Sequence, residues 1–320
     1  MEKGRCLMSM AAYARARSFS ETKLAILRSS LGAVAPGGLS VLTFGSYARR
    51  EASENSDLDY LLVVEGDDPA EEPASATQIR AIISSHVPID PGAGGPFGGH
   101  IMGTDLLRNV GGNDDTNKAI TRRILLLLEG DWLCCGEESF RLLRRSLITK
   151  YVTATPPRDH QLALFLLNDI IRYWRTITVD YAFKIAEEGK DWGLRNIKLM
   201  YSRKLMYASG LFGVAMTADR SVDRKIDFLD EFFTAPVIDR IVSVAGASES
   251  RRVMELYDQF LDHLEQKSVR DHLKSLTPAD RDDELFRELK NEGHRFTREL
   301  LNLFEKTFHS THLIHRAVIF

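Results

Sequence analysis

The most constraining feature of this 320-residue chain is a short strand that runs directly into a glycine-serine turn. Residues 39–44 are apolar or β-branched, which predicts a strand, and Gly45-Ser46 follows at once. A second strand is predicted over residues 59–64. Asp57 and Asp59 are two residues apart, so their carboxylates lie on one face of extended chain. The pattern predicts a strand-turn-strand unit with two carboxylates beside a glycine turn.

These residue types suit the binding of phosphate and metal ions. Gly45 allows the backbone to approach an anion closely, and Ser46 adds a hydroxyl at a turn into a helix, where free amides can point at an anion. Two carboxylates on one face can bridge a pair of Mg²⁺ ions. The sequence therefore predicts a site for a nucleoside triphosphate and its metal ions.

At these residues the chain resembles the DNA polymerase β-like nucleotidyltransferase superfamily. The superfamily pattern is an apolar residue, Gly, Gly or Ser, about ten residues, and then Asp-apolar-Asp-apolar. Phe44-Gly45-Ser46, ten intervening residues and Asp57-Leu58-Asp59-Tyr60 satisfy every term. Three flanking positions agree as well: Arg49, Glu51 and Ser56. Arg50 stands where Gly is common, and we expect this change to affect helix packing more than chemistry.

The resemblance implies an α+β fold, with a small mixed-sheet nucleotidyltransferase domain followed by an all-helical C-terminal domain. It implies that Asp57 and Asp59 are catalytic residues that bind two Mg²⁺ ions, with Mn²⁺ as an alternative. Family members usually carry a third carboxylate on a neighbouring strand. We assign Asp90 to this catalytic and metal-binding role and keep Asp105 in reserve, because Pro91 and the glycines after it are also typical of a turn.

The resemblance also implies residues that bind the nucleotide. Gly45, Ser46 and Arg49 belong to the matched region, and Tyr47 directly follows the turn. In the superfamily a helical domain commonly lends a Lys or Arg to the triphosphate. We expect the basic groups of the helical half to act here, with Lys198 first, then Arg195, and Arg172 on a helix face shared with Asn168 and Arg175. A solvated basic face explains any one of these residues equally well.

Periodicity divides the chain into an α/β half and a helical half. Helices are predicted near 20–32, with Ser20 as the cap, and near 76–85 and 119–129, and a short strand at 100–102. Later helices are predicted near 137–150, 158–188, 194–209, 251–267 and 278–308, the last of them capped by Thr277. Pro156-Pro157 marks the boundary between a catalytic domain, residues 1–155, and a helical domain, residues 156–320, that closes the nucleotide cleft.

Composition narrows the partners and the compartment. The net charge is -3, so any site for a polyanion must be a local basic patch. Cys6, Cys134 and Cys135 are odd in number, and the adjacent pair is poorly placed for an ordinary disulfide, which indicates a reducing compartment. No secretory signal and no long apolar segment is found. We therefore predict a cytoplasmic protein without direct membrane insertion.

The motif indicates the nucleotide donor and leaves the acceptor open. The first hypothesis is template-independent transfer from an NTP, such as ATP, or a dNTP to a nucleotide or oligonucleotide hydroxyl, as in the oligonucleotide-making and antiviral (anti-phage) defence branches of the superfamily. Aromatic residues interleaved with basic ones around 172–207 favour it. Alternatives are nucleotidylation of a protein, including self-modification, and a non-catalytic toxin-antitoxin component. The base, the sugar, an effector or partner protein and homo-oligomerisation stay open.

Overall fold

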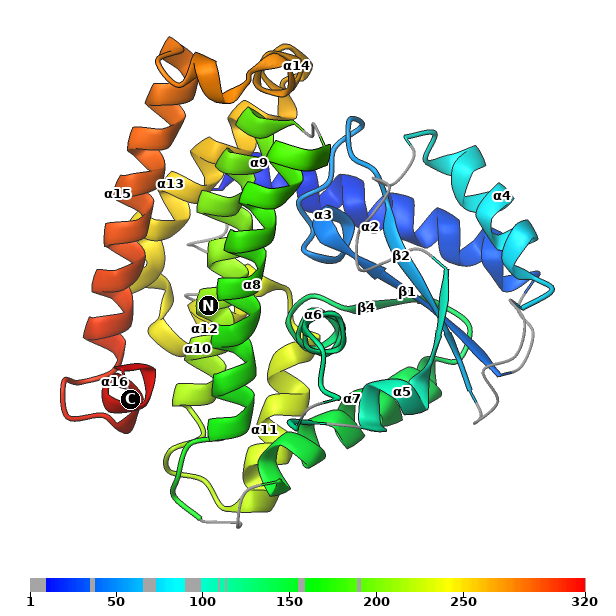
Figure 1. The fold of residues 1–320 in the computed structure, drawn as a ribbon, viewed down its shortest axis with the longest axis vertical. Helices are drawn as coiled ribbons and strands as arrows, with labels where there is room; N and C mark the ends of the chain where they lie inside the picture. Colours follow the sequence, from blue (N-terminus) through cyan, green and yellow to red (C-terminus); the bar gives the residue numbers. More distant parts are fainter. Residues whose placement is uncertain are drawn as a thin grey trace.

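The computed structural model describes residues 10–34, 38–65, 73–89, 99–108, 110–112, 114–154, 159–188 and 191–319. Figure 1 shows a small sheet flanked by helices on one side of the molecule and a group of long helices on the other. The α+β class with a helical C-terminal part, expected from the sequence, is confirmed.

The first half contains a four-stranded sheet and six helices over its described residues. These are α2 (Ala11–Gly32), β1 (Leu39–Phe44), α3 (Gly45–Ala48), β2 (Asp59–Val64), α4 (Ala76–His86), β3 (His100–Met102), α5 (Gly103–Arg108), α6 (Asn117–Leu128), β4 (Asp131–Cys134) and α7 (Glu137–Thr153).

The second half is helical throughout its described residues. Its elements are α8 (Leu164–Glu188), α9 (Trp192–Lys198), a π-helical turn (Leu199–Arg203), α10 (Lys204–Ala215), α11 (Val222–Thr234), α12 (Val237–Ala245), α13 (Ala247–Glu265), α14 (Lys267–Ser275), a 3₁₀ turn (Pro278–Asp280), α15 (Glu284–Thr307) and α16 (Leu313–Ile319).

The order of strands in the sheet is β3-β2-β1-β4. β1 pairs antiparallel with both β2 and β4, and β2 pairs parallel with β3. The register sets Phe44 opposite Asp59 and Thr43 opposite Asp131. The end of β1 and the starts of β2 and β4 therefore meet at one end of the sheet, which is the end that carries the turn at Gly45.

The sheet is buried on both faces, because alternate residues of each strand point into different cores. Leu39 and Val41 pack with α2 and α4, whereas Leu42 and Phe44 pack with α6 and α7. The second core continues without a break into the helical half, as far as Phe296 of α15. In Figure 1, α6 accordingly lies between the sheet and α8.

Most of the predicted elements are confirmed, but two predicted helix caps are wrong. Thr277 caps only the 3₁₀ turn at Pro278–Asp280, and the last long helix, α15, begins at Glu284 with Asp283 as its cap. The first helix begins at Ala11, so Ser20 is no cap: it is fully buried, its hydroxyl donates to the Ala16 carbonyl, and its Oγ accepts from the Ala52 amide. β4 was not expected, because four residues are too few to give a periodic signal.

The proposed domain boundary at Pro156-Pro157 falls outside the described residues. The division at residue 155 therefore stays a prediction. The continuous core shows that the helical half packs on the sheet half through apolar contacts, and not through a polar interface alone.

A buried ion network ties α6 and α7 to α8. Arg123 donates from Nη2 to both oxygens of Asp115 at 2.8 Å and to Asp169 at 3.2 Å, and from Nε to the Tyr151 hydroxyl at 3.0 Å. The Tyr151 hydroxyl donates to Asp169 at 2.7 Å. The side chains of Arg123, Asp115 and Asp169 are at most 4% exposed, so these charges depend on one another for solvation.

We predict that Arg123→Met destabilises the fold, because it leaves two buried carboxylates without their cation. The free energy of unfolding should fall by about 3–5 kcal/mol in urea titrations. Arg141→Met is the matched control, because Arg141 pairs with Glu138 on the surface and should cost less than about 1 kcal/mol. Equal effects of the two substitutions would contradict the prediction.

Candidate active site

The site is built around a glycine that accepts a carboxylate at close range. Gly45 directly follows β1 and begins α3 with a positive φ of 66°, a conformation that favours glycine. A Cβ atom at this position would overlap Oδ2 of Asp59, which stands opposite in the register. The Thr43 hydroxyl also donates to the Asp59 carbonyl at 3.2 Å. Glycine is therefore required here both by the backbone and by the neighbouring carboxylate.

The two predicted carboxylates lie together at this end of the sheet. Asp57 precedes β2 and Asp59 begins it, while Leu58 between them is buried in the core below. Burial first, and then the charges of Asp57 and Glu129, raise the pKa of Asp59 to about 6. Two crowded carboxylates in a poorly solvated place repel one another. Such a pair of oxygen ligands is a donor set that a divalent metal ion prefers.

A lysine from the helical half faces the two carboxylates. Lys198 is the last residue of α9, and its charge lowers the pKa of Asp59. The charge of Asp57 raises the pKa of Lys198. Burial first, and then the charges of Arg270, Arg49 and Arg203, lower the pKa of Lys198 to about 8. The structure thus brings the predicted Lys198 to the carboxylate pair across some 140 residues of sequence. A concentration of positive charge beside two carboxylates suits the binding of a triphosphate together with its metal ions.

Arg49 forms the centre of a second buried network. Its Nε donates to Glu51 at 2.9 Å and its Nη1 donates to Glu129 at 2.5 Å. The Tyr257 hydroxyl donates to Glu51 at 2.5 Å and lies 3.0 Å from the Oγ of Ser202. The side chain of Arg49 is 11% exposed and enclosed by two carboxylates. Its guanidinium fixes the turn after β1 against α6 and the helical half, and nucleotide contact by Arg49 stays a prediction.

The backbone at Arg50 has the left-handed conformation that glycine adopts most easily, and glycine is common at this position in the superfamily. The φ of Arg50 is 64°, in the left-handed region, and its Nη1 donates to the carbonyls of Tyr47 and Ala48 at 3.1 and 3.0 Å. Its Nη2 donates to Asp131 at 2.8 Å. The side chain therefore closes the end of α3 and joins it to β4, in agreement with the expected effect on packing.

The other predicted residues differ in how close they lie to the carboxylates. Burial first, and then the charge of nearby Asp57, raise the pKa of Tyr47. The Tyr47 ring is 2% exposed and packs near Phe19, so it belongs to the core under the turn. Arg172 donates to Asp169 at 3.3 Å and so joins the network of Arg123. Arg195 lies half-buried on α9, three residues before Lys198. Ser46 is half-buried within α3.

The third carboxylate was placed at Asp90, which lies outside the described residues. Asp105, the reserve, is exposed and pairs with Arg108 on α5. Because β3 runs parallel to β2, α5 follows the end of the sheet opposite to Asp59, so Asp105 is far from the site. Among the described residues, no group of three or more His, Cys, Asp or Glu side chains could hold a metal ion.

Sequence reasoning missed two charged groups of the site. Glu129 follows α6, and its charge raises the pKa of Asp59. Glu129 does so although it also forms an ion pair with Arg49. Arg270 of α14 lies close enough to act on both Asp57 and Lys198. Only the apolar run before Glu129 hinted that this acid is buried. Nothing in the sequence around Arg270 distinguishes it from a solvated helical arginine.

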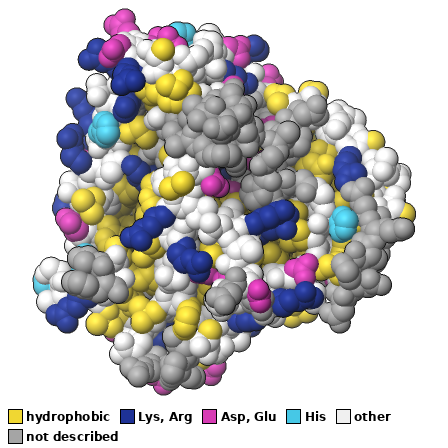
Figure 2. Space-filling model, in the orientation of Figure 1, with side chains coloured by type: hydrophobic (Ala, Val, Ile, Leu, Met, Phe, Trp, Pro, Cys, Tyr) yellow, Lys and Arg dark blue, Asp and Glu magenta, His cyan; other side chains and the backbone are white. Residues whose placement is uncertain are grey.

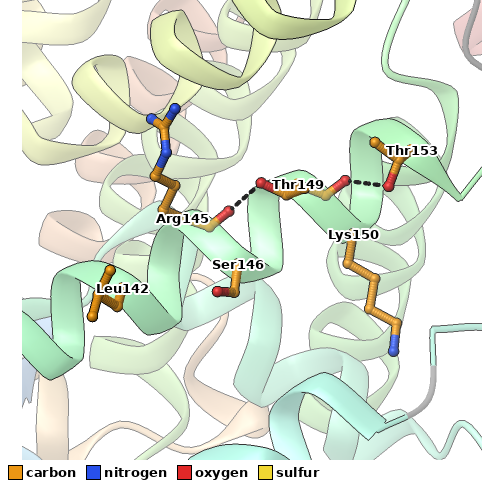
Figure 3. Close-up of a pocket in the computed structure, with 6 residues that line it drawn as sticks. All are labelled: Leu142, Arg145, Ser146, Thr149, Lys150 and Thr153. Atoms are coloured by element: carbon orange, nitrogen blue, oxygen red, sulfur yellow. Dashed lines mark hydrogen bonds between the residues drawn. The ribbon is translucent and has the colours of Figure 1, made fainter.

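A hollow along α7, drawn in Figure 3, is a separate feature. It is lined by Leu142, Arg145, Ser146, Thr149, Lys150 and Thr153. Arg145 pairs with Asp227 at 2.6 Å, and Lys150 donates to the carbonyls of Leu107 and Arg108. Both cations that line the hollow already have partners, and we assign it no function.

The site is a glycine turn between two antiparallel strands, with two carboxylates beside it. Residues 25–91 match the family model described as a nucleotidyltransferase domain, which belongs to the polymerase β-like superfamily. The chain therefore carries a nucleotidyltransferase domain and is a transferase of nucleotidyl groups. The match includes Gly45, Ser46, Asp57 and Asp59. No curated protein matches the chain. In the described part of the chain, no helix is long and apolar enough to cross a membrane.

We predict that Gly45→Ala abolishes nucleotide binding, because the new methyl group displaces the Asp59 carboxylate. Gly38→Ala is the matched control: Gly38 also has a positive φ, 79°, but an added Cβ would meet nothing within 4 Å. Both variants should lose about 1–2 kcal/mol of stability from backbone strain. Only Gly45→Ala should lose binding of a non-hydrolysable NTP analogue, measured by calorimetry. Equal binding by the two variants would rule out the close approach as a functional requirement.

We further predict that Asp59→Asn stabilises the metal-free protein at pH 7.5. The pKa of Asp59 is about 6 in the folded chain, above its ordinary value of 3.8, so folding favours the protonated form. Its contribution to stability is therefore greatest below pH 4 and is lost as the pH rises through 6. The thermal midpoint of Asp59→Asn should exceed that of the wild type at pH 7.5 in EDTA, and the difference should vanish near pH 4. A lower midpoint for the variant at pH 7.5 would refute the predicted cost of the charged carboxylate.

Proposed function

We propose that this enzyme catalyses Mg²⁺-dependent, template-independent transfer of a nucleoside monophosphate from an NTP or dNTP to a hydroxyl of a nucleotide or oligonucleotide. The observation that carries the proposal is the close approach of the Gly45 turn to the Asp59 carboxylate, with Asp57 and Lys198 near enough for their charges to act on Asp59. Two carboxylates and a facing cation at a glycine turn match the needs of phosphoryl transfer, which depends on positioning and charge stabilisation.

Each residue has a defined task in the proposed reaction. Asp57 and Asp59 would hold Mg²⁺, which when bound neutralises charge on the triphosphate. The turn at Gly45 begins α3, whose first amides lack intrahelical partners and can donate to phosphate oxygens. Lys198 stabilises the negative charge that develops on the pyrophosphate as the bond to the α-phosphorus breaks. The acceptor hydroxyl loses its proton as the new phosphodiester bond forms.

A stacked aromatic pair beside basic residues supports a nucleic acid acceptor. Trp174 of α8 and Tyr207 of α10 are half-buried and stack with ring centroids 4.9 Å apart and an interplanar angle of 19°. Burial raises the pKa of Tyr207, and the nearby charge of Arg175 opposes this shift. Figure 2 shows Lys and Arg side chains among apolar ones on one face of the molecule. Bases stack on such rings, and phosphates pair with such cations.

The activity test is incubation of the purified chain with each labelled NTP and dNTP and Mg²⁺, with and without short oligonucleotides. Label in a protease-resistant ladder would support the proposed acceptor, and label on protein would instead indicate nucleotidylation of protein. Asp57→Asn should lower the rate by about 10³-fold, since several kcal/mol of charge stabilisation are lost.

Two further variants sharpen this test. Asp105→Asn is the matched control, because its carboxylate lies at the opposite end of the sheet and its loss should leave the rate unchanged. Asp90→Asn examines the proposed third carboxylate and should lower the rate by about 10²-fold or more. No label from any nucleotide with wild-type protein, or equal label with Asp57→Asn, would overturn the proposed function.

A further inference from the structure

Arg270 carries a buried guanidinium with unused hydrogen-bonding capacity. The residue is 6% exposed, and its Nη2 donates to the Asn55 carbonyl at 2.6 Å. Its Nε has no hydrogen-bond partner among the described residues. An arginine presents five N–H donors, and a buried donor left without a partner costs free energy. The Nη2 atom of Arg270 therefore has a hydrogen-bond partner, whereas its Nε has none among the described residues.

The packing of α14 on α9 brings Arg270 close enough to Lys198 for their charges to interact. Gly193 of α9 lies against the Leu273 carbonyl, and a Cβ at Gly193 would overlap that oxygen. Leu273 is fully buried in this contact. The two helices can approach closely for this reason, and Figure 1 shows α9 and α14 together at the end of the molecule near α3. Two cations on neighbouring helices thus lie near enough to Asp57 to feel its charge.

The charges around Arg270 point to an anion and not to a simple ion pair. Burial lowers the pKa of Arg270, and the nearby charge of Asp57 opposes this shift. Arg270 in turn lowers the pKa of Lys198, so the two cations repel one another in a poorly solvated place. If Asp57 binds a metal ion, it no longer compensates either cation. A multiply charged anion that bridges both would remove the repulsion and satisfy the free Nε.

We propose that Arg270 is a second phosphate-binding residue that, together with Lys198, binds the β- and γ-phosphates of the donor triphosphate. This inference rests on the proposed function, because it assigns a further contact in the same site. The planar guanidinium can donate two parallel hydrogen bonds to phosphate oxygens, whereas the Lys198 ammonium acts as a point charge. The bond to Asn55 also joins phosphate binding to the loop that leads to Asp57.

The test measures the binding of two probes of opposite charge. Arg270→Gln should weaken binding of inorganic tripolyphosphate by about 10- to 100-fold in calorimetry, because charge-assisted hydrogen bonds are lost. The same substitution removes a positive charge beside Asp57, so Mn²⁺ affinity, measured by electron paramagnetic resonance without phosphate, should hold or increase. Lys274→Gln is the matched control: Lys274 is exposed on the same helix and should change neither affinity.

Other outcomes would overturn the assignment. Equal weakening of tripolyphosphate and Mn²⁺ would mean that Arg270 only positions the loop at Asn55, and unchanged tripolyphosphate binding would remove its role altogether. A wild type that does not bind tripolyphosphate would also refute it. If Arg270→Gln does not fold, Arg270→Lys is used in its place. This variant keeps the positive charge but lacks the planar guanidinium with its two parallel donors, so tripolyphosphate should bind about 3- to 10-fold more weakly. Absence of transfer activity alone would refute the proposed function and leave this binding test intact.

Discussion

The site depends on the buried pairing of Arg49 with two carboxylates. Glu51 comes from the loop after β1 and Glu129 from the end of α6, so one guanidinium joins the glycine turn to the helix behind the sheet. Tyr257 extends the link to α13 through its hydrogen bond to Glu51. Breaking such a pair from one side leaves a buried charge, at a cost of about 3–5 kcal/mol. The position of the turn is thus coupled to both halves of the molecule.

The same end of the sheet holds charges that oppose folding. Asp59 and Lys198 both have a pKa shifted toward the neutral form, by burial first and by like charges second. Arg123 and Arg49 show the contrasting arrangement, in which each buried cation has carboxylate partners. Groups whose pKa is shifted without full compensation gather where ligands bind, because a bound ligand supplies the missing charge. The contrast separates the site from the networks that only hold the fold together.

The parts of the site that could be predicted from sequence are those fixed by local geometry. Gly45 and Asp59 are adjacent because a short antiparallel connection sets Phe44 opposite Asp59, and this spacing is visible in the chain. The superfamily resemblance and helical periodicity predict Lys198, and in the fold its charge acts on Asp59. Such reasoning works where few residues separate the partners or where a family pattern bridges the gap.

The remaining residues depend on packing that the sequence does not encode locally. Arg270 donates a hydrogen bond to Asn55, 215 residues away in the sequence. The sequence of its helix, α14, is typical of a polar surface helix. Arg172 shares a helix face with Asn168, but periodicity could not show that Asp169 would bind it. Tyr47 adjoins the turn in sequence, yet the helical turn directs its ring into the core. In each case a side chain's direction was decided by a distant element.

The continuous core limits how the helical half can act on a nucleotide. Apolar residues from Leu42 in the sheet to Phe296 in α15 belong to one buried cluster, so a hinge between the halves would expose them to water at about 25 cal/mol per Å². The Arg49 and Tyr257 link crosses the same boundary and would have to break as well. These costs favour a site whose cations are already in position over one assembled by closure of a separate domain. The π-helical turn directly after Lys198 is then the place where small adjustments can occur, because such turns interrupt the regular ladder of helical hydrogen bonds.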